Sequence, residues 1–255
     1  MACLAYLGYA QILMGQTGLG LASQQQACDF ATRRAHPFSQ VYSLSFKALA
    51  HMFLRDPALV ASHARSALAL ADRHDFGFWQ LFNRVLLNWC DYESQGDLPH
   101  FARFRESIAA FCDLGASLWI SHTLTLVAEG LGRHSRTPEG LEVLDAVEAM
   151  VARDGERFYE AEAKRVRAEL LAQAGQREQA LQALAQAMEA AGRQGAVLFS
   201  LRAAMTMNRL AISAADARMA QEALREAWSK LDEEMRALPD GQAAKQLLEA
   251  WGDPP

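Results

Sequence analysis

The sequence predicts an all-α protein, a right-handed solenoid of about six antiparallel helix pairs that repeats every 40 residues. The first observation is a glycine or aspartate that recurs at this interval and is followed four residues later by an aromatic side chain. The second is a further series of short polar or small turns, half a period out of phase with the first. The third is composition, because Leu and Ala dominate while Val, Ile and Thr are sparse, which favours helix over strand.

The two turn series define the period. In the first, the pairs are Asp75 with Trp79, Gly115 with Trp119, Gly155 with Tyr159, and Gly195 with Phe199. The second runs through Gly15-Gln16, Arg55-Asp56, Gln95-Gly96-Asp97, Ser135-Arg136, Gly175-Gln176 and Ala215-Asp216. Each unit of a repeat array packs only on its neighbours, so a chain of this length need not divide into separate globular domains. We therefore expect a single repeat domain over residues 1–255.

Each unit is predicted to contain two antiparallel helices. The units are expected at residues 1–34, 35–74, 75–114, 115–154, 155–194 and 195–234, followed by a terminal helix at 240–251. The first unit is partial and begins with a helix from Ala2 to Met14. In the second, a helix from Phe38 to Leu54 precedes one from Pro57 to Arg73, because proline is favoured at the first helical position.

The third unit repeats this plan, with helices from Gly77 to Ser94 and from Leu98 to Leu114. The later units are expected to turn at residues 132–138, 174–176 and 215–216. The segment Leu238-Pro239-Asp240-Gly241 then breaks the chain ahead of the last short helix. We call the first helix of each unit the A helix and the second the B helix.

Columns of equivalent positions predict how the units pack. A small residue recurs in the B helices at Ala27, Ala67, Ser107, Val147, Ala187 and Ala227. The A helices carry a small column at Ser43, Asn83, Thr123, Ala163 and Ala203, and a mostly large one at Phe46, Leu86, Leu126, Val166 and Thr206. Aromatic, small and large residues at spacings of four and three lie on one helical face. Large side chains opposite small ones are expected to fill the core, and the aromatic series with Trp119 belongs to it.

Charge and composition narrow the classes of function. The net charge of −5 argues against a nucleic-acid surface, which needs a clustered basic face. No apolar run reaches the length of about 18 residues that a membrane span requires. The apolar first helix lacks the positive segment of a signal peptide, since the first basic residue is Arg33. Cys3, Cys28, Cys90 and Cys112 have no close spacing and are expected to be buried reduced thiols of a cytoplasmic protein.

Catalytic and metal-binding motifs are missing from the sequence. It contains no phosphate-binding G-x-x-x-x-G-K-[ST], no H-E-x-x-H, no G-x-S-x-G and no C-x-x-C, and its seven histidines lack metal-ligand spacing. Carboxylates stand four residues from bases, as in Glu160–Lys164 and Arg165–Glu169, which is typical of solvated helix-supporting ion pairs. We therefore expect a protein that is not an enzyme and has neither cofactor nor metal.

One column marks the candidate binding residues. It reads Tyr42, Phe82, His122, Glu162 and Arg202, one position before the small column of the A helices, and so should point into or beside the interface between units. Arg165 lies one helical turn after Glu162. We select Phe82, His122, Glu162, Arg165 and Arg202. The structural interpretation pairs Glu162 with the two arginines; the functional one lets the arginines hold an anionic ligand or a partner carboxylate.

Several phrases resemble known repeat proteins. Leu7-Gly8-Tyr9, the small columns and the Gly-Asp turn are similar to tetratricopeptide repeats, although 40 residues exceed the usual 34. Residues 2–9, 115–119, 156–162 and 201–204 resemble the C-terminal helical-repeat region of large bacterial regulators that combine an adenylate-cyclase-like domain with a signalling ATPase. The chain departs from that pattern at Ala5, Ala10, Ala168 and Ser200. The resemblance implies a repeat module of a signalling regulator.

Two functional hypotheses follow. The first is a scaffold or sensory module that holds a protein or peptide on the surface formed by the A helices. The second is a pocket for a small effector inside the superhelix. The first helix is apolar and carries no charge, so we also expect it to dock on a missing ATPase or cyclase domain or on a second copy of the chain.

Overall fold

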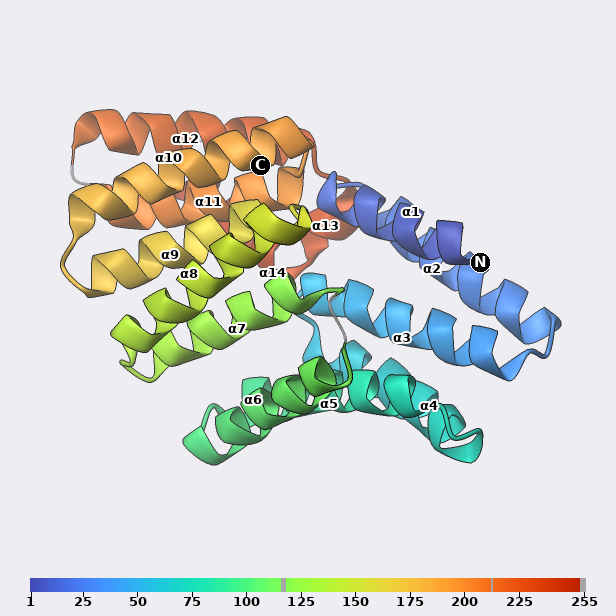
Figure 1. The fold of residues 1–255 in the computed structure, drawn as a ribbon. Coiled ribbons are helices and arrows are strands. Elements are labelled where there is room, and N and C mark those ends of the chain that lie inside the picture. The colour runs from blue at the N-terminus through green and yellow to red at the C-terminus, as the bar shows by residue number, and fades with distance from the viewer. Residues whose placement is uncertain (116–117, 212, 253–255) are drawn as a thin grey trace. The chain divides into compact units, whose positions relative to one another are not determined.

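The computed structural model describes residues 1–115, 118–211 and 213–252. Within these ranges every regular element is an α-helix, and there are fourteen (Figure 1). The prediction of an all-α helical repeat is therefore confirmed. The first six helices are α1 (Ala2–Leu13), α2 (Thr17–Arg33), α3 (Pro37–Phe53), α4 (Pro57–Arg73), α5 (Gly77–Gln95) and α6 (Leu98–Asp113). The others are α7 (Ile120–Arg133), α8 (Thr137–Asp154), α9 (Glu160–Gln173), α10 (Arg177–Gln194), α11 (Val197–Leu210), α12 (Ala214–Ser229), α13 (Glu233–Ala237) and α14 (Pro239–Ala250).

The helices group into two compact units. The first holds α1 to α6 and the second α7 to α14, with the short turn Leu13–Gly15 assigned to the second. In each unit a helix contacts its neighbours in sequence, and successive A helices also touch, as α3 does α5 and α9 does both α7 and α11. Such contacts between sequence neighbours are those of a helical-repeat solenoid.

The turns share one backbone conformation. A residue with positive φ recurs every 20 residues, in two series that each have a period of 40. One series comprises Ala35, Asp75, Gly115, Gly155 and Gly195, and the other comprises Gly15, Arg55, Gly96, Ser135 and Gly175. A left-handed residue after the last helical turn is a common way to end a helix. The two turn series found in the sequence are thus two sets of helix stops.

Hydrogen bonds in these turns repeat as well. The amide that follows the left-handed residue donates to a carbonyl five residues earlier, as in Asp56 to His51 at 3.1 Å and Gln176 to Leu171 at 2.8 Å. The same bond recurs at Gln16, Phe76, Arg136 and Ala196. This 6→1 bond belongs to the Schellman motif and satisfies a carbonyl that the helix leaves open.

The α5–α6 turn departs from the period by one residue and then returns to it. The left-handed position is Gly96, whereas the other turns of this series place it at 15, 55, 135 and 175. Helix α5 has 19 residues and α6 has 16, whereas α3 and α4 each have 17. The next left-handed residue, Gly115, is back in register. One extra residue is therefore absorbed at this turn.

The predicted turn at Ala215-Asp216 is wrong. Both residues lie in the first turn of α12, and the chain turns just before Ser213. The Ser213 hydroxyl caps the Asp216 amide at 3.1 Å, and the Asp216 carboxylate accepts from the Ser213 amide at 2.9 Å. This capping box starts the helix three residues before the aspartate, which the sequence analysis had placed in the turn. The short helix α13 was not predicted.

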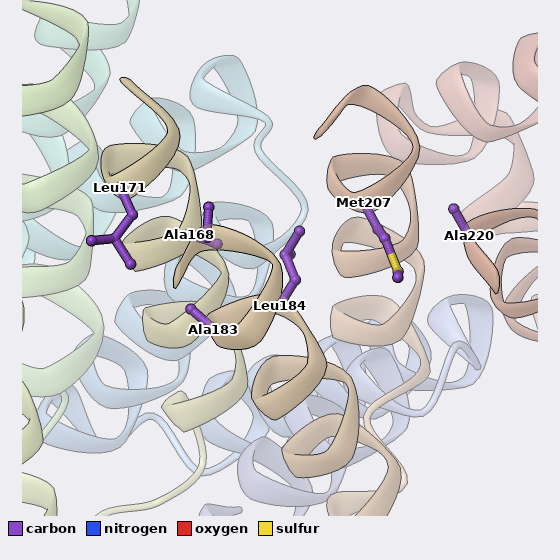
Figure 2. Packing of buried hydrophobic residues seen from close by; sticks show 7 residues of the cluster. Ala168, Leu171, Ala183, Leu184, Met207 and Ala220 are labelled. Carbon is purple, nitrogen blue, oxygen red and sulfur yellow. The ribbon is translucent and has the colours of Figure 1, made fainter. Parts of the chain in front are cut away.

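The predicted columns form the core. Of the large column, Phe46, Leu86, Leu126, Val166 and Thr206 are all buried. The clearest packing in the second unit joins α9 to α12, where small residues face large ones. Figure 2 shows Ala168 and Leu171 of α9, Ala183 and Leu184 of α10, Met207 of α11 and Ala220 of α12. Alanines at these contacts let the helices approach closely, and the neighbouring Leu and Met side chains fill the space.

The aromatic series also belongs to the core. Trp79, Trp119, Tyr159 and Phe199 are all buried, so the prediction that Trp119 packs inside is confirmed. The Trp119 ring meets the Phe158 ring edge-on at 4.8 Å between centroids. The expectation of buried thiols is correct for Cys28 and Cys90, but Cys3 is exposed and Cys112 is half-buried.

Candidate functional site

The mixed column gathers three of its residues at the A helices of the second unit. His122 of α7, Glu162 of α9 and Arg202 of α11 occupy equivalent positions, and all three are buried. Phe82 lies in the first unit, where it contacts Trp79 at 5.6 Å and Phe111 at 5.7 Å between ring centroids. Phe82 is therefore a core residue of its own unit, and the structure does not bring it together with the others.

Glu162 is the centre of a buried ion-pair network. Its side chain is fully buried, and its Oε1 accepts a hydrogen bond from Arg165 Nη2 at 2.8 Å. Arg202 Nη1 lies 3.6 Å from the same oxygen. The predicted grouping of Glu162 with both arginines is confirmed. A buried carboxylate is tolerated only when charges and hydrogen bonds compensate for lost hydration, and two guanidinium groups provide this compensation.

Each arginine also reaches a second carboxylate. Arg202 binds Asp240, in the first turn of α14, through Nε at 2.8 Å and Nη2 at 2.6 Å. Arg165 Nη1 lies 2.9 Å from Glu169 Oε1, and Glu169 pairs in turn with Arg209 of α11. The network therefore runs from α14 through α11 and α9 and returns to α11.

Electrostatics keep Arg165 charged. Burial alone would lower the pKa of its guanidinium, but the negative charges of Glu162 and Glu169 outweigh this effect and raise the pKa well above its ordinary value. The sequence analysis had assigned Arg165–Glu169 to the solvated ion pairs. That assignment is wrong for Arg165, which is buried between α9 and α11 and also donates to Thr206 Oγ1 at 3.5 Å.

His122 belongs to the packing of the same column. Its imidazole meets the Tyr159 ring edge-on at 4.5 Å between centroids, and Tyr159 meets Phe199 in the same way at 5.2 Å. The three side chains come from three successive A-helix starts, so aromatic contacts link α7, α9 and α11 beside the ion pairs.

A groove opens next to the network. It has a volume of about 570 Å³ and is formed by the C-terminal halves of α7, α9 and α11 with the start of α10. Val166, Leu170 and Leu210 supply apolar surface, and the charged lining comprises Glu129, Arg133, Glu169, Arg177 and Arg209. Gly132 allows α7 and α9 to approach here, since a Cβ at this position would lie 2.5 Å from Leu170 Cδ2.

The repeat places three of the charged residues in a row. Glu129, Glu169 and Arg209 stand 40 residues apart on successive A helices, all of them lining the groove. Arg177 closes one end, where it donates to the Leu210 carbonyl at 2.9 Å and the Ala211 carbonyl at 3.1 Å at the end of α11. The sequence analysis missed this row, although its 40-residue spacing was the signal that could have found it.

A carboxylate from the next unit holds the start of α7. Glu156 accepts from the Trp119 amide at 2.7 Å through Oε1 and from the Ser121 hydroxyl at 2.8 Å through Oε2. A carboxylate at a helix N-terminus satisfies open amides and favours the helix dipole. Trp119 itself has a positive φ of 69°, so the loop leaves the usual turn pattern at this point.

The described residues contain no group of three or more His, Cys, Asp or Glu side chains that could hold a metal ion. Within the same part of the chain, no helix combines the length and apolar character needed to cross a membrane.

Comparison with known proteins gives one informative match. No protein-family model matches the chain. An uncharacterized protein of Rhizobium meliloti (strain 1021) is 27% identical over 210 residues. The match covers 82% of this chain and 20% of the relative. The chain therefore spans about a fifth of the length of the curated relative that it matches.

Proposed function

We propose that this chain is a non-catalytic interaction module that holds a protein or peptide partner on the groove of its second unit. The observation that carries the proposal is the groove itself, in which consecutive A helices present charged and apolar side chains side by side. Repeat proteins bind extended partners on surfaces built in this way. The groove combines an apolar floor with charges that can fix the direction of a bound segment.

The ion-pair network supports the groove rather than forming its surface. Glu162, Arg165 and Arg202 are buried, whereas Arg177 and Arg209 are exposed at the groove. The network fixes α9 against α11 and α14, and Glu169 joins it to the groove through Arg209. We therefore assign the notebook of buried charges to positioning, and we assign partner contacts to Arg177, Arg209 and Gln173.

The proposed biological setting is a longer signalling regulator. The resemblance to the repeat regions of bacterial regulators supports it, as does the length of the Rhizobium meliloti relative, of which four-fifths lies outside the matched segment. In such a protein this chain would be the cytoplasmic sensory or scaffolding repeat region, and enzymatic steps would belong to other domains.

A small effector is the second candidate. A volume of about 570 Å³ falls within the range of small-molecule sites, which is roughly 300–1,000 Å³. The guanidinium groups of Arg177 and Arg209 would suit an anionic effector. The length of the bound object separates the two candidates, because a peptide must contact α7, α9 and α11 together whereas a small molecule needs only two of these helices.

Selection from a displayed random peptide library tests the proposal. Peptides selected on the full chain should bind in calorimetry, and Gln173→Glu or Arg209→Glu should each weaken that binding at least tenfold. Gln186→Glu, at an exposed position of α10 outside the groove, is the matched control and should bind as the wild type does. If no selected peptide depends on Gln173 or Arg209, the peptide-groove proposal is wrong. Saturable binding of a small anion that requires Arg177 or Arg209 would instead support the effector candidate.

A further inference from the structure

Helix α1 exposes a face that the other A helices bury. Tyr6 is 44% exposed and Leu7 is 48% exposed, and Cys3 and Ala10 beside them are also exposed. These residues lie on adjoining turns of one side of α1, and none is charged.

The 40-residue register identifies what this face should contact. The equivalent residues of α3 are Ser43, Phe46, Lys47 and Ala50. Ser43 is 1% exposed, Phe46 is 3% exposed and Ala50 is fully buried, while Lys47 is half-buried. The same positions of the repeat are therefore covered in α3 and open in α1.

The preceding B helix is what covers α3. Helix α2 packs along α3, and Lys47 Nζ donates to Gln25 Oε1 of α2 at 2.6 Å. The hydroxyl of Ser43 lies within hydrogen-bonding reach of the Cys28 thiol of α2, an interaction that acts on the pKa of Cys28. One unit later, α4 packs along α5 in the same order, and Gln80 Nε2 reaches the Ala71 carbonyl at 3.5 Å.

We propose that the exposed face of α1 is the docking surface for a B helix of a further 40-residue repeat, carried in a longer polypeptide. The interface would continue the one that α2 makes with α3. The length of α1 fits this proposal, because α1 has 12 residues where α3 has 17. The Rhizobium meliloti relative, most of which lies outside the match, is an example of such a longer chain. The proposal refines the expectation that α1 docks on another domain or on a second copy, and it is independent of the groove.

A register-preserving extension tests the proposal on the full chain. A copy of residues 17–41 is fused ahead of Ala2, so that the copied α2 and turn precede α1 as they precede residue 42. The copied residues 37–41 also lengthen α1 to match α3. If the proposal is correct, the added helix should bury the face. The melting temperature should rise by several degrees, and the reaction rate of Cys3 with a maleimide should fall at least tenfold.

Ala10→Glu provides the matched control. Ala10 is exposed, so the substitution should leave the unextended chain nearly unchanged, whereas its counterpart Ala50 is fully buried. In the extended chain Ala10→Glu should abolish both the rise in melting temperature and the protection of Cys3. A second fusion that copies residues 17–40, one residue out of register, should give neither effect because the added helix would present another face.

Two outcomes would overturn the proposal. An extended chain with an unchanged melting temperature and an unprotected Cys3 would show that the face does not accept the repeat's own B helix. A dimer of the unextended chain in sedimentation, with Cys3 protected at high concentration and both effects lost in Ala10→Glu, would assign the face to a second copy instead.

Discussion

Glu162 and Arg202 stand one repeat apart, on α9 and α11, and their charged groups approach to 3.6 Å in the interior. The pair links neighbouring units at the same column position, with Arg165 and Asp240 completing the charges on either side. A buried network of this kind contributes less to stability than its contacts suggest, but removing one member leaves others uncompensated. The energetic consequence can be measured directly.

Glu162→Gln should lower the free energy of unfolding by about 3 kcal/mol, at the lower end of the range for breaking a buried ion pair. The lower end is expected because Arg165 and Arg202 each keep a second carboxylate, Glu169 and Asp240. Chemical denaturation measures the change. Glu148→Gln, which removes an exposed partner of Arg167, is the control and should change stability by less than about 1 kcal/mol. Neutral and additive effects of Glu162→Gln and Arg202→Gln in a double-mutant cycle would contradict the pairing.

Trp119→Ala should destabilise the chain by about 3–5 kcal/mol, the usual effect of truncating a large buried aromatic side chain. Because units of a repeat array unfold with limited cooperativity, the loss is expected to separate the denaturation curve into more than one step. Leu118→Ala is the matched control, since the neighbouring Leu118 is exposed. A wild-type curve for Trp119→Ala would be inconsistent with the buried position of the ring.

The stability of the first unit should fall as the pH is lowered from 6.5 to 4. His51 stacks on His63 at 5.3 Å between ring centroids. Burial, followed by the nearby His63, lowers the pKa of His51 to about 4, while Asp56 opposes the shift and Lys47 adds to it. The folded state therefore binds fewer protons than the unfolded state in this interval, and stability rises with pH across it.

Denaturation at several pH values tests this prediction. His51→Gln should flatten the dependence between pH 4 and 6.5, because glutamine does not titrate. The pKa of His63 is also lowered, mainly by burial, so His51→Gln should leave part of the dependence in place. A slope as steep as that of the wild type would assign the effect to other groups.

Ala35→Gly should stabilise the protein by about 1 kcal/mol, because Ala35 has a positive φ of 47° that glycine adopts without a steric penalty. Ala69→Gly is the matched control, since Ala69 is an exposed residue inside α4 and its replacement should destabilise by about 1 kcal/mol. Thermal unfolding of both variants gives the comparison. Destabilisation by both would show that the strain at Ala35 is negligible.

The sequence allowed much of the fold to be predicted because one chemical signal recurs. Positive-φ residues at both turn series and buried side chains in the columns follow directly from the 40-residue register. The grouping of Glu162 with Arg202 was predictable for the same reason, since equivalent positions of adjacent A helices lie side by side.

The remaining site residues could not be found in this way. Asp240 lies in α14, which does not belong to a repeated pair, so no column leads to it. Glu156 reaches the start of α7 from a loop, and loop geometry does not follow helical periodicity. The burial of Arg165 was missed because an i, i+4 pair with Glu169 has the same spacing on a solvated helix and on one packed against α11.

The turn at Gly96 has a consequence for how such chains can change in length. An additional residue within a helix would rotate everything beyond it by about 100° and move the columns off the core. At the α5–α6 turn the surplus is confined to the connection, since α5 ends one residue late, α6 begins one residue late, and the columns of α6 keep their register. Single-residue insertions and deletions should therefore be tolerated at the left-handed residues and rejected a few positions away, so that gaps in an alignment of related chains would fall about every 20 residues.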